Sequence, residues 1–366
     1  MIKDQTQLEQ FQLAFDNLLQ TSVYQVPQKN KQQALLPIFN LLHQHHQTHC
    51  LAYANIMQQA NGTVNALADL PYLAVRLFKQ LSLSSVPQQD VFKVLQSSGT
   101  TSQRPASIFL DKATSGRQSK VLVKVLQETL GKQRLPMLII DSPAVLKDKS
   151  LFSARGAGIQ GLSFFGRDHT YALDDNMQLN WSAIDAFHQK YQDQPVLIFG
   201  FTFMVWLYFI QGLKQQAKTV RFNHGVLLHS GGWKKLEGQR VDNHQFKHLL
   251  AQTTGVERCY NFYGMAEQVG SVFMECEQGY LHAPVFADVI IRDPFTLEVA
   301  PIGQSGLVQV LSVLPTSYPG HSILTEDLGT LIGTDDCQCG RQGHYFTIQG
   351  RLPKTEVRGC SDTHSA

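Results

Sequence analysis

Hydrophobic residues change their spacing between the start of the chain and the rest of it. Over residues 1–62 they recur with a helical period, first at 8–19 and again at 35–42, which is typical of amphipathic helices. We therefore predict an α-helical N-terminal region that packs on the rest of the chain. His43, His45, His46 and His49 would lie on a polar, solvated helix face, with metal ligation as the alternative interpretation.

From residue 91 onward, short apolar runs alternate with amphipathic segments. Strands are predicted at 91–95, 137–140, 196–199, 225–229 and 256–262, and helices at 182–191, 202–218 and 244–252, with Asp242 as N-cap of the last. This alternation indicates an α/β fold, in which ligand loops follow the carboxyl ends of the strands. Beyond residue 283 only shorter strands and turns are predicted, which favours a β-rich subdomain at about 283–349.

The stretch 194–213 carries no charged residue and is long enough to cross a membrane. Pro195 to Gly200 fits a short buried strand, Gly200 is a turn residue, and a helix can begin near residue 202, so a buried strand followed by a buried helix is the better prediction. We expect no membrane span. The aromatic residues between Phe199 and Phe209 are candidates for an acyl-chain pocket.

Candidate chemistry begins with the polar segment after the first of these strands. Gly99 allows unusual backbone angles and the flanking hydroxyls can donate to phosphate oxygens, so we predict a phosphate loop. Its residues are Ser97, Ser98, Gly99, Thr100, Thr101 and Ser102. No Gly-Lys-Ser/Thr follows, so it is not a Walker loop, and a polar turn between strands is the alternative.

Further motifs follow in a fixed order: Tyr263-Gly264-Met265-Ala266-Glu267, Thr325-Glu326-Asp327-Leu328-Gly329 and Gly350-Arg351. Together with the hydroxyl-rich loop, they resemble the core motifs of the adenylate-forming (acyl/aryl-CoA ligase) superfamily. The resemblance implies the N-terminal domain of such an enzyme, with stacked α/β sheets plus a β-rich subdomain. We expect an adenylation core at 63–349, and a hinge remnant and mobile tail at 350–366. The C-terminal domain that carries a catalytic lysine in coenzyme A ligases is expected to be lacking.

The same resemblance implies roles for individual residues and a requirement for ATP and Mg²⁺. Tyr263 would stack on adenine, Asp327 would accept hydrogen bonds from the ribose hydroxyls, and Arg351 would contact ribose or phosphate. Glu267 suits a Mg²⁺ ligand, because Mg²⁺ prefers carboxylate and phosphate oxygens. The remaining candidates for contact with the nucleotide are Gly231, Gly232 and Gly264. Ala266 stands where the superfamily usually has Thr, and a plain surface turn is the alternative for this motif.

Four soft ligands form a separate pattern: Cys276, His282, Cys337 and Cys339. They suit tetrahedral Zn²⁺, and phenylacetate-CoA-ligase-like members of the superfamily carry a similar set. Structural zinc is therefore expected. The alternative is that these residues are unrelated, with Cys276 buried as a small hydrophobic side chain.

Near its C-terminus the chain has Arg358-Gly359-Cys360-Ser361. With Ser230-Gly231-Gly232-Trp233-Lys234 and Thr316-Ser317-Tyr318-Pro319, this tail is similar to acyl-protein synthetases of the LuxE type. That resemblance implies that a fatty acid is activated as acyl-AMP and passed to Cys360, then to a partner such as an acyl reductase or acyl carrier. The alternatives are adenylation of an aryl or hydroxy acid for coenzyme A or a carrier protein, and a non-catalytic nucleotide-binding module.

Charge and cysteine content limit the binding partners and the cellular compartment that we expect. The 366 residues have a formal net charge of +2, with acidic and basic residues interspersed, which gives no footprint for nucleic acid. Six cysteines are few for this length, and the N-terminus lacks a basic-then-apolar signal pattern. We expect a cytoplasmic protein with reduced thiols.

Overall fold

The computed structural model of the protein describes residues 2–60, 62–96, 105–147, 154–218 and 220–352. Its helices are α1 (Ile2–Gln20), α2 (Gln28–His49), α3 (Leu51–Ile56), α4 (Leu77–Gln80), α5 (Lys112–Leu130), α6 (Ala144–Lys147), α7 (Ala154–Ser163), α8 (Trp181–Tyr191), α9 (Thr202–Met204), a π-helical segment (Val205–Gln211), α10 (Gly212–Gln215) and α11 (Asn243–Thr254).

The strands are β1 (Leu73–Ala74), β2 (Lys93–Gln96), β3 (Ser107–Leu110), β4 (Leu135–Ile139), β5 (Gly166–Tyr171), β6 (Val196–Phe201), β7 (Gly225–Ser230), β8 (Arg258–Tyr263), β9 (Phe273–Glu275), β10 (Leu281–His282), β11 (Ala287–Arg292), β12 (Ser305–Ser312), β13 (Ser322–Thr334) and β14 (His344–Arg351).

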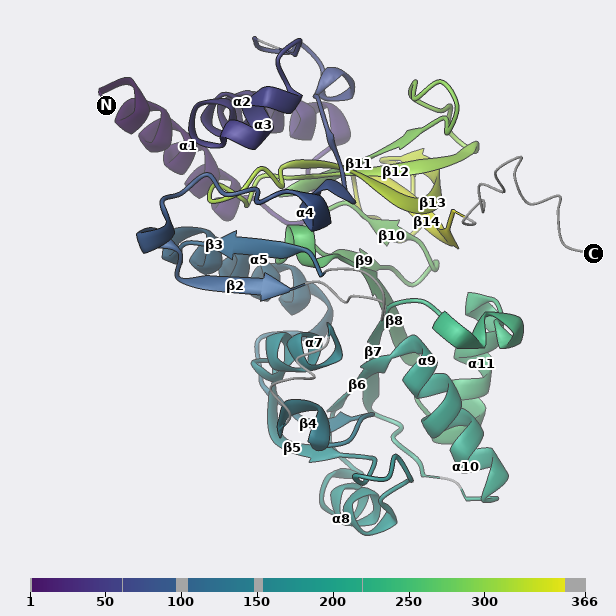
Figure 1. Ribbon diagram of the computed structural model, residues 1–366. Helices are drawn as coiled ribbons and strands as arrows, with labels where there is room; N and C mark the ends of the chain where they lie inside the picture. The colour runs from purple at the N-terminus through teal and green to yellow at the C-terminus, as the bar shows by residue number, and fades with distance from the viewer. Residues whose placement is uncertain (1, 61, 97–104, 148–153, 219, 353–366) are drawn as a thin grey trace, which may run out of the picture.

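A 12-stranded sheet runs through the molecule in the order β11-β12-β13-β14-β10-β9-β8-β7-β6-β4-β5, with β1 beside β13, while β2 and β3 form a separate hairpin. The strands β5-β4-β6-β7-β8 are parallel, and the path from β8 to β11 is antiparallel. In Figure 1 the parallel half lies below, flanked by α7 to α11, and α1 to α3 cover the antiparallel half above. This is the mixed α/β architecture that the sequence predicts.

Local signals set several boundaries. The carboxylate of Asp242 accepts from the backbone N–H of Gln245 at 2.7 Å, which confirms the predicted N-cap of α11. That helix ends at Gly255, whose φ of +72° is the left-handed conformation of a helix C-terminus. The predicted single helix at 202–218 is instead α9, the π-helical segment and α10, which ends at Gln215.

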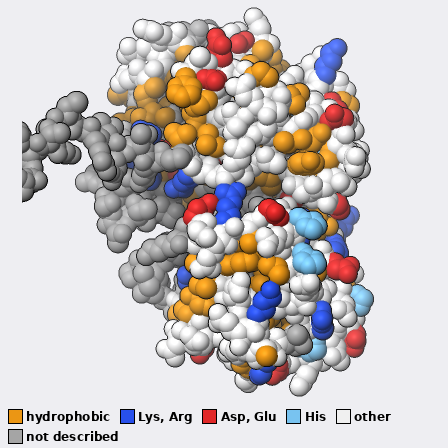
Figure 2. Space-filling model, turned by 90° about the vertical axis from the view of Figure 1, so that its right-hand side faces the viewer, with side chains coloured by type: hydrophobic (Ala, Val, Ile, Leu, Met, Phe, Trp, Pro, Cys, Tyr) orange, Lys and Arg blue, Asp and Glu red, His pale blue; other side chains and the backbone are white. Residues whose placement is uncertain are grey.

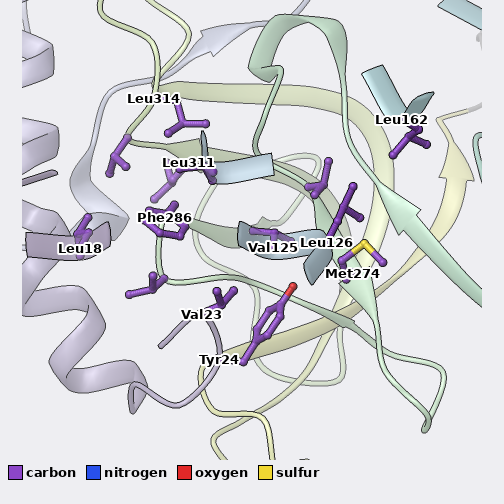
Figure 3. Packing of buried hydrophobic residues seen from close by; sticks show 14 of the residues in the cluster. Leu18, Val23, Tyr24, Val125, Leu126, Leu162, Met274, Phe286, Leu311 and Leu314 are labelled. Atoms are coloured by element: carbon purple, nitrogen blue, oxygen red, sulfur yellow. The ribbon is translucent and has the colours of Figure 1, made fainter. Parts of the chain in front are cut away.

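A large hydrophobic cluster joins the N-terminal helices to the sheet. Figure 3 shows Leu18 of α1 and Val125 of α5 in the same cluster as Phe286 and Leu311. Phe286 is fully buried. Burial of apolar surface on this scale is the main favourable contribution to folding, so the N-terminal helices are part of the core, as their amphipathic pattern predicts.

The histidines of α2 are a correction to the sequence analysis. His43 and His46 are buried, not solvated. His46 Nε2 donates to the carbonyl of Pro315 at 3.2 Å, and its Nδ1 accepts from the Ser85 hydroxyl at 2.8 Å. Since both ring nitrogens are used within the protein, the imidazole of His46 joins the helix to the loop before β13.

The aromatic run predicted as an acyl pocket is divided by the sheet. Phe199 belongs to the cluster on one face, whereas Trp206 and Phe209 belong to the cluster on the other. The run therefore cannot line a single pocket along its whole length. Among the described helices, none combines the length and the apolar character that a membrane crossing needs. On the face in Figure 2, acidic and basic side chains are interspersed.

Candidate active site

The carboxyl ends of three parallel strands meet at one edge of the sheet. Phe201 of β6 lies beside Ser230 of β7, which lies beside Phe262 of β8. Gly231 follows β7 with a φ of +82°, and a Cβ there would lie 3.2 Å from the Phe201 ring. Gly231 and Gly232 are exposed, so their backbone is open to a flat ligand. In open α/β sheets, ligands bind at such an edge.

Tyr263, at the end of β8, reaches across this edge to β13. Its hydroxyl donates to Asp327 Oδ2 at 2.7 Å, and Arg351 Nε lies 3.7 Å from Asp327 Oδ1. Asp327 and Arg351 are register partners on β13 and β14. Burial raises the pKa of both Tyr263 and Asp327, while the Tyr263 hydrogen bond and Arg351 counteract the shift at Asp327. The structure thus brings together three predicted nucleotide-contacting residues.

Glu267 lies in a short turn after Tyr263 and Gly264, and is 6% exposed. Burial raises the pKa of its carboxyl, and the charge of Asp327 adds to the rise. The neighbouring Gln268 donates to the carbonyls of Val310 and Gly320, at 3.0 and 2.8 Å. These bonds fix the backbone that carries Glu267. A carboxylate at this position is a donor type that fits Mg²⁺, which binds one or two carboxylates together with phosphate oxygens and water.

The loop before β13 supports this turn, although the sequence analysis used its residues 316–319 only as part of a family resemblance. A Cβ on Gly320 would lie 2.8 Å from the Glu267 carbonyl oxygen, so the two backbones pass closely. Tyr318 is fully buried, and its hydroxyl accepts from Gln118 of α5 at 3.4 Å. The Pro315 carbonyl of this loop accepts from His46 Nε2. The loop therefore contacts both helix α2 and the turn that carries Glu267.

A second residue that sequence reasoning missed is Asn261, on β8 two positions before Tyr263. Its backbone N–H donates to Glu275 Oε2 at 2.7 Å. Its side-chain Oδ1 is buried and has no hydrogen-bond partner among the described residues. The available signal was a polar residue inside an otherwise apolar strand pattern. The predicted phosphate loop, Ser97 to Ser102, and the predicted acyl acceptor, Cys360, lie outside the described residues.

The predicted zinc ligands come together at the opposite end of β14. The ligand atoms of Cys276, His282, Cys337 and Cys339 all lie within 4.8 Å of one another. Cys276 Sγ is 3.9 Å from Cys337 Sγ, and Cys339 Sγ is 3.4 Å from His282 Nε2. The first two cysteines and the histidine are buried. Cys276 and His282 are more than fifty positions from Cys337 and Cys339, yet the ligand atoms of all four lie together. The alternative interpretation, that these residues are unrelated, is therefore wrong.

The chemistry of this cluster fits Zn²⁺. Cys276 and Cys337 each open a tight turn closed by a glycine, since Gly279 N–H donates to Cys276 O and Gly340 N–H donates to Cys337 O, both at 2.9 Å. Burial lowers the pKa of His282 to about 3, with Arg341 adding to the effect, so its imidazole is neutral and can ligate through Nε2. Three thiols and a neutral imidazole at this spacing are a tetrahedral donor set.

The fold is similar to that of adenylate-forming ligases. A 2-hydroxyisobutyryl-CoA ligase, in an open conformation with its acyl-AMP and CoA, aligns over 90% of this chain and 72% of its own, with a TM-score of 0.70 and 16% identity. Its postadenylation state aligns over 90% and 69%, with a TM-score of 0.69 and 16% identity. At this identity the likeness shows the fold alone.

The family model described as acyl-protein synthetase, LuxE, matches residues 13–366, and the chain belongs to this family. Long-chain-fatty-acid–luciferin-component ligases are curated relatives. The Vibrio harveyi protein is 28% identical over 41% of this chain and 39% of its own length. That of Aliivibrio fischeri is 26% identical over 43% and 42%. The alignments therefore span about two fifths of the length of these relatives.

Proposed function

We propose that the protein is an AMP-forming ligase that activates a fatty acid with ATP. The observation that carries this proposal is the convergence of Tyr263, Asp327 and Arg351 at the sheet edge, with Glu267 in the following turn. Membership of the acyl-protein synthetase family supports the substrate class. In this proposal residues 63–349 form the adenylation core, with 283–349 as its β-rich part, and 350–366 carry the hinge and the acceptor thiol.

Each residue of the edge has a part in the first step. A carboxylate oxygen of the fatty acid attacks the α-phosphorus of ATP, the bond to the bridging oxygen breaks, and pyrophosphate leaves, so that acyl-AMP forms. Asp327 accepts from the ribose hydroxyls, the Tyr263 ring lies against adenine, and Gly231, Gly232 and Gly264 let the backbone approach the base. Positioning the two anions in line supplies much of the rate acceleration.

Charge neutralisation is the other requirement of this step. Glu267 would hold Mg²⁺, which supplies positive charge beside the phosphate oxygens when it is bound. Arg351 would contact ribose or phosphate, and the hydroxyls of Ser97 to Ser102 would donate to the triphosphate.

In the second step the Cys360 thiolate attacks the acyl carbonyl, a thioester forms and AMP leaves. A thiolate is a strong nucleophile for an activated acyl group, and a partner such as an acyl reductase would then receive the acyl group from the thioester.

The test is acid-dependent exchange of labelled pyrophosphate into ATP across a panel of acids, followed by labelling with a radioactive fatty acid. We expect long-chain aliphatic acids to support the fastest exchange and the wild type to acquire a hydroxylamine-sensitive label. Cys360→Ser should keep the exchange and lose the label, with Cys259→Ser as the control. Faster exchange with aromatic or short hydroxy acids would overturn the substrate class. If none of the acids supports exchange, the activity itself is overturned.

We also propose that the cysteine–histidine cluster holds structural zinc. It joins the turn after β9 to the connection between β13 and β14, and structural zinc contributes directly to folding. We expect about one zinc per chain by elemental analysis. Cys337→Ser should release the metal and lower the unfolding temperature, whereas Cys50→Ser, outside the cluster, should retain it. Full zinc content in Cys337→Ser would contradict the site.

A further inference from the structure

Arg341 directly follows the turn that carries Cys339, and it has no part in the proposed adenylation. Its backbone N–H donates to Cys339 Sγ at 3.5 Å. Its guanidinium Nη1 donates to the carbonyls of Met274 and Glu275, both at 3.4 Å, and these two residues directly precede Cys276. One side chain therefore holds together the two segments that carry the cysteines of the cluster.

An aromatic ring also fixes this guanidinium. Arg341 Cζ lies 4.5 Å from the centroid of the Tyr24 ring, and Tyr24 is buried. The Tyr24 carbonyl accepts from the backbone N–H of Gln342 at 2.7 Å, and its ring meets the ring of His282 edge-on, with centroids 6.3 Å apart. Planar guanidinium groups stack on aromatic faces in a way that an ammonium group does not. The loop between α1 and α2 therefore helps to hold the charge beside the cluster.

The guanidinium lacks an acidic partner within the part of the chain that the structure describes, where its contacts are the two carbonyls and the Tyr24 ring. The cluster has the opposite imbalance when it is loaded. Three thiolates and a neutral imidazole around Zn²⁺ leave one negative charge. Most of these ligands are buried, where an uncompensated charge is costly. A half-buried cation without a carboxylate partner is the matching countercharge.

The histidine ligand leaves the outer support of the cluster to other groups. A metal-ligating histidine usually donates its second ring N–H to a protein group. His282 Nε2 lies 3.4 Å from Cys339 Sγ, and its Nδ1 is buried without a hydrogen-bond partner among the described residues. The contacts that tie the ligands to their surroundings therefore run through Arg341 and not through the imidazole.

We infer that Arg341 positions the two segments that carry the cysteines and neutralises the charge of the zinc–thiolate cluster, and so sets its affinity for zinc. This inference rests on the proposed zinc site and goes beyond it, because Arg341 is not a ligand. It is a positioning residue, which supplies a positive charge and hydrogen bonds without touching the metal.

The experiment measures the zinc dissociation constant of the full chain by competition with a chromophoric chelator. Loss of a group that supports metal ligands typically costs 10–100-fold in affinity, so the dissociation constant of Arg341→Gln should rise by about 10- to 100-fold. Arg341→Lys keeps the charge and should recover about half of that loss on a logarithmic scale. Arg134→Gln is the matched control and should equal the wild type, since Arg134 also donates to a backbone carbonyl, that of Gly166 at 2.9 Å.

A rise of less than about tenfold in Arg341→Gln would overturn the inference, and so would equal losses in the Gln and Lys variants. The visible spectrum of the Co²⁺-loaded protein gives a second readout. At saturating Co²⁺ it should be the same in Arg341→Gln as in the wild type, because the ligands are unchanged. A different spectrum would overturn the inference, since the lost affinity would then come from the ligands themselves.

If Arg341→Gln does not fold, a crystal structure of the zinc-loaded wild type decides. The guanidinium should keep its hydrogen bonds to the carbonyls of Met274 and Glu275. A guanidinium turned to solvent would overturn the inference.

The two proposals fail in different ways. A wild type that binds no zinc refutes the metal site, and this inference with it. A wild type that binds zinc no more tightly than Arg341→Gln refutes only the role of Arg341. Neither result bears on the ligase activity, which pyrophosphate exchange tests.

Discussion

Beneath α2 a buried ammonium and carboxylate pair with one another, whereas at the carboxyl ends of β7 and β8 two buried polar atoms have no hydrogen-bond partner in the described part of the chain. Lys31 Nζ lies 3.3 Å from Asp288 Oδ1, and both side chains are 2% exposed. Asp288 also accepts from Gln28 Nε2 at 2.6 Å and from His344 Nδ1 at 2.8 Å. We call these four residues the anchor.

The two regions therefore differ in role: the anchor stabilises the fold, whereas the edge of the sheet is available to bind a ligand. Burial alone would raise the pKa of Asp288, but Lys31 and His344 hold it well below its usual range, so the anchor keeps its charges only as a set. Its groups satisfy one another and fix α2 to β11 and β14. His229 Nε2 and Asn261 Oδ1 have no such partners among the described residues, so they remain free to hydrogen-bond a ligand. Substitutions in the anchor should change stability, and substitutions at the edge should change catalysis.

The largest effect is expected at Glu267. Glu267→Gln removes the proposed Mg²⁺ ligand, so kcat/KM for pyrophosphate exchange should fall on the order of a thousandfold. The unfolding free energy should not decrease, because burial already raises the pKa of this carboxyl and so disfavours its charge. The exposed Glu257→Gln is the control. A loss of kcat/KM of tenfold or less would show that Glu267 is not the Mg²⁺ ligand.

In the anchor the expected effect is on folding. Asp288→Asn leaves the Lys31 ammonium buried without its carboxylate, which should cost about 3 kcal/mol or more of unfolding free energy. Urea denaturation measures it, with the exposed Asp185→Asn as a control. The specific activity of the folded fraction should be retained. A stable but inactive variant would break the distinction between the two regions.

Acid should weaken the interface between α2 and the loop before β13. Burial lowers the pKa of His321 to about 3 and that of His46 well below its usual value. The unfolded chain therefore binds more protons than the folded protein below about pH 6.5, and stability falls as pH falls. We expect a loss of about 1.4 kcal/mol per histidine between about pH 7.5 and about pH 5.5.

The measurement is the urea midpoint across this range, for the wild type and for His321→Asn. The variant should show a shallower dependence on pH by about one proton, whereas His188→Asn should match the wild type. An unchanged slope in His321→Asn would show that this imidazole does not titrate on unfolding.

The smallest effect is expected at Tyr263. Tyr263→Phe removes the 2.7 Å hydrogen bond to Asp327 but keeps the ring, so KM for ATP should rise by less than about tenfold and kcat should hold. Tyr208→Phe is the control. A hundredfold loss of kcat would mean that the hydroxyl, and not the ring, is what the site uses.

Local signals made much of the fold predictable. Asp242 caps its helix through a neighbour three positions away, and the predicted apolar run at 196–199 lies within strand β6. The anchor was not predictable, because Gln28 and Asp288 are 260 positions apart and nothing local announces their pairing. Burial of His43 and His46 escaped prediction for the same reason, since their partners include Ser85, Pro315 and Tyr53.

At the candidate site, motif order identified Tyr263, Glu267, Asp327 and Arg351, and the structure brings the first, third and fourth into contact. It could not show that His229 Nε2 and Asn261 Oδ1 lack a hydrogen-bond partner among the described residues, because that property depends on which neighbouring groups reach them.

The central claim is that residues at the carboxyl ends of the parallel strands catalyse the formation of an acyl-adenylate. The direct measurement is mass spectrometry of the protein mixed with ATP, Mg²⁺ and a long-chain fatty acid, using Cys360→Ser so that the adenylate is not consumed. We expect acyl-AMP to accumulate toward one equivalent per site, and not to form in Cys360→Ser combined with Glu267→Gln. Release of ADP without acyl-AMP, or no product with any acid, would contradict the account.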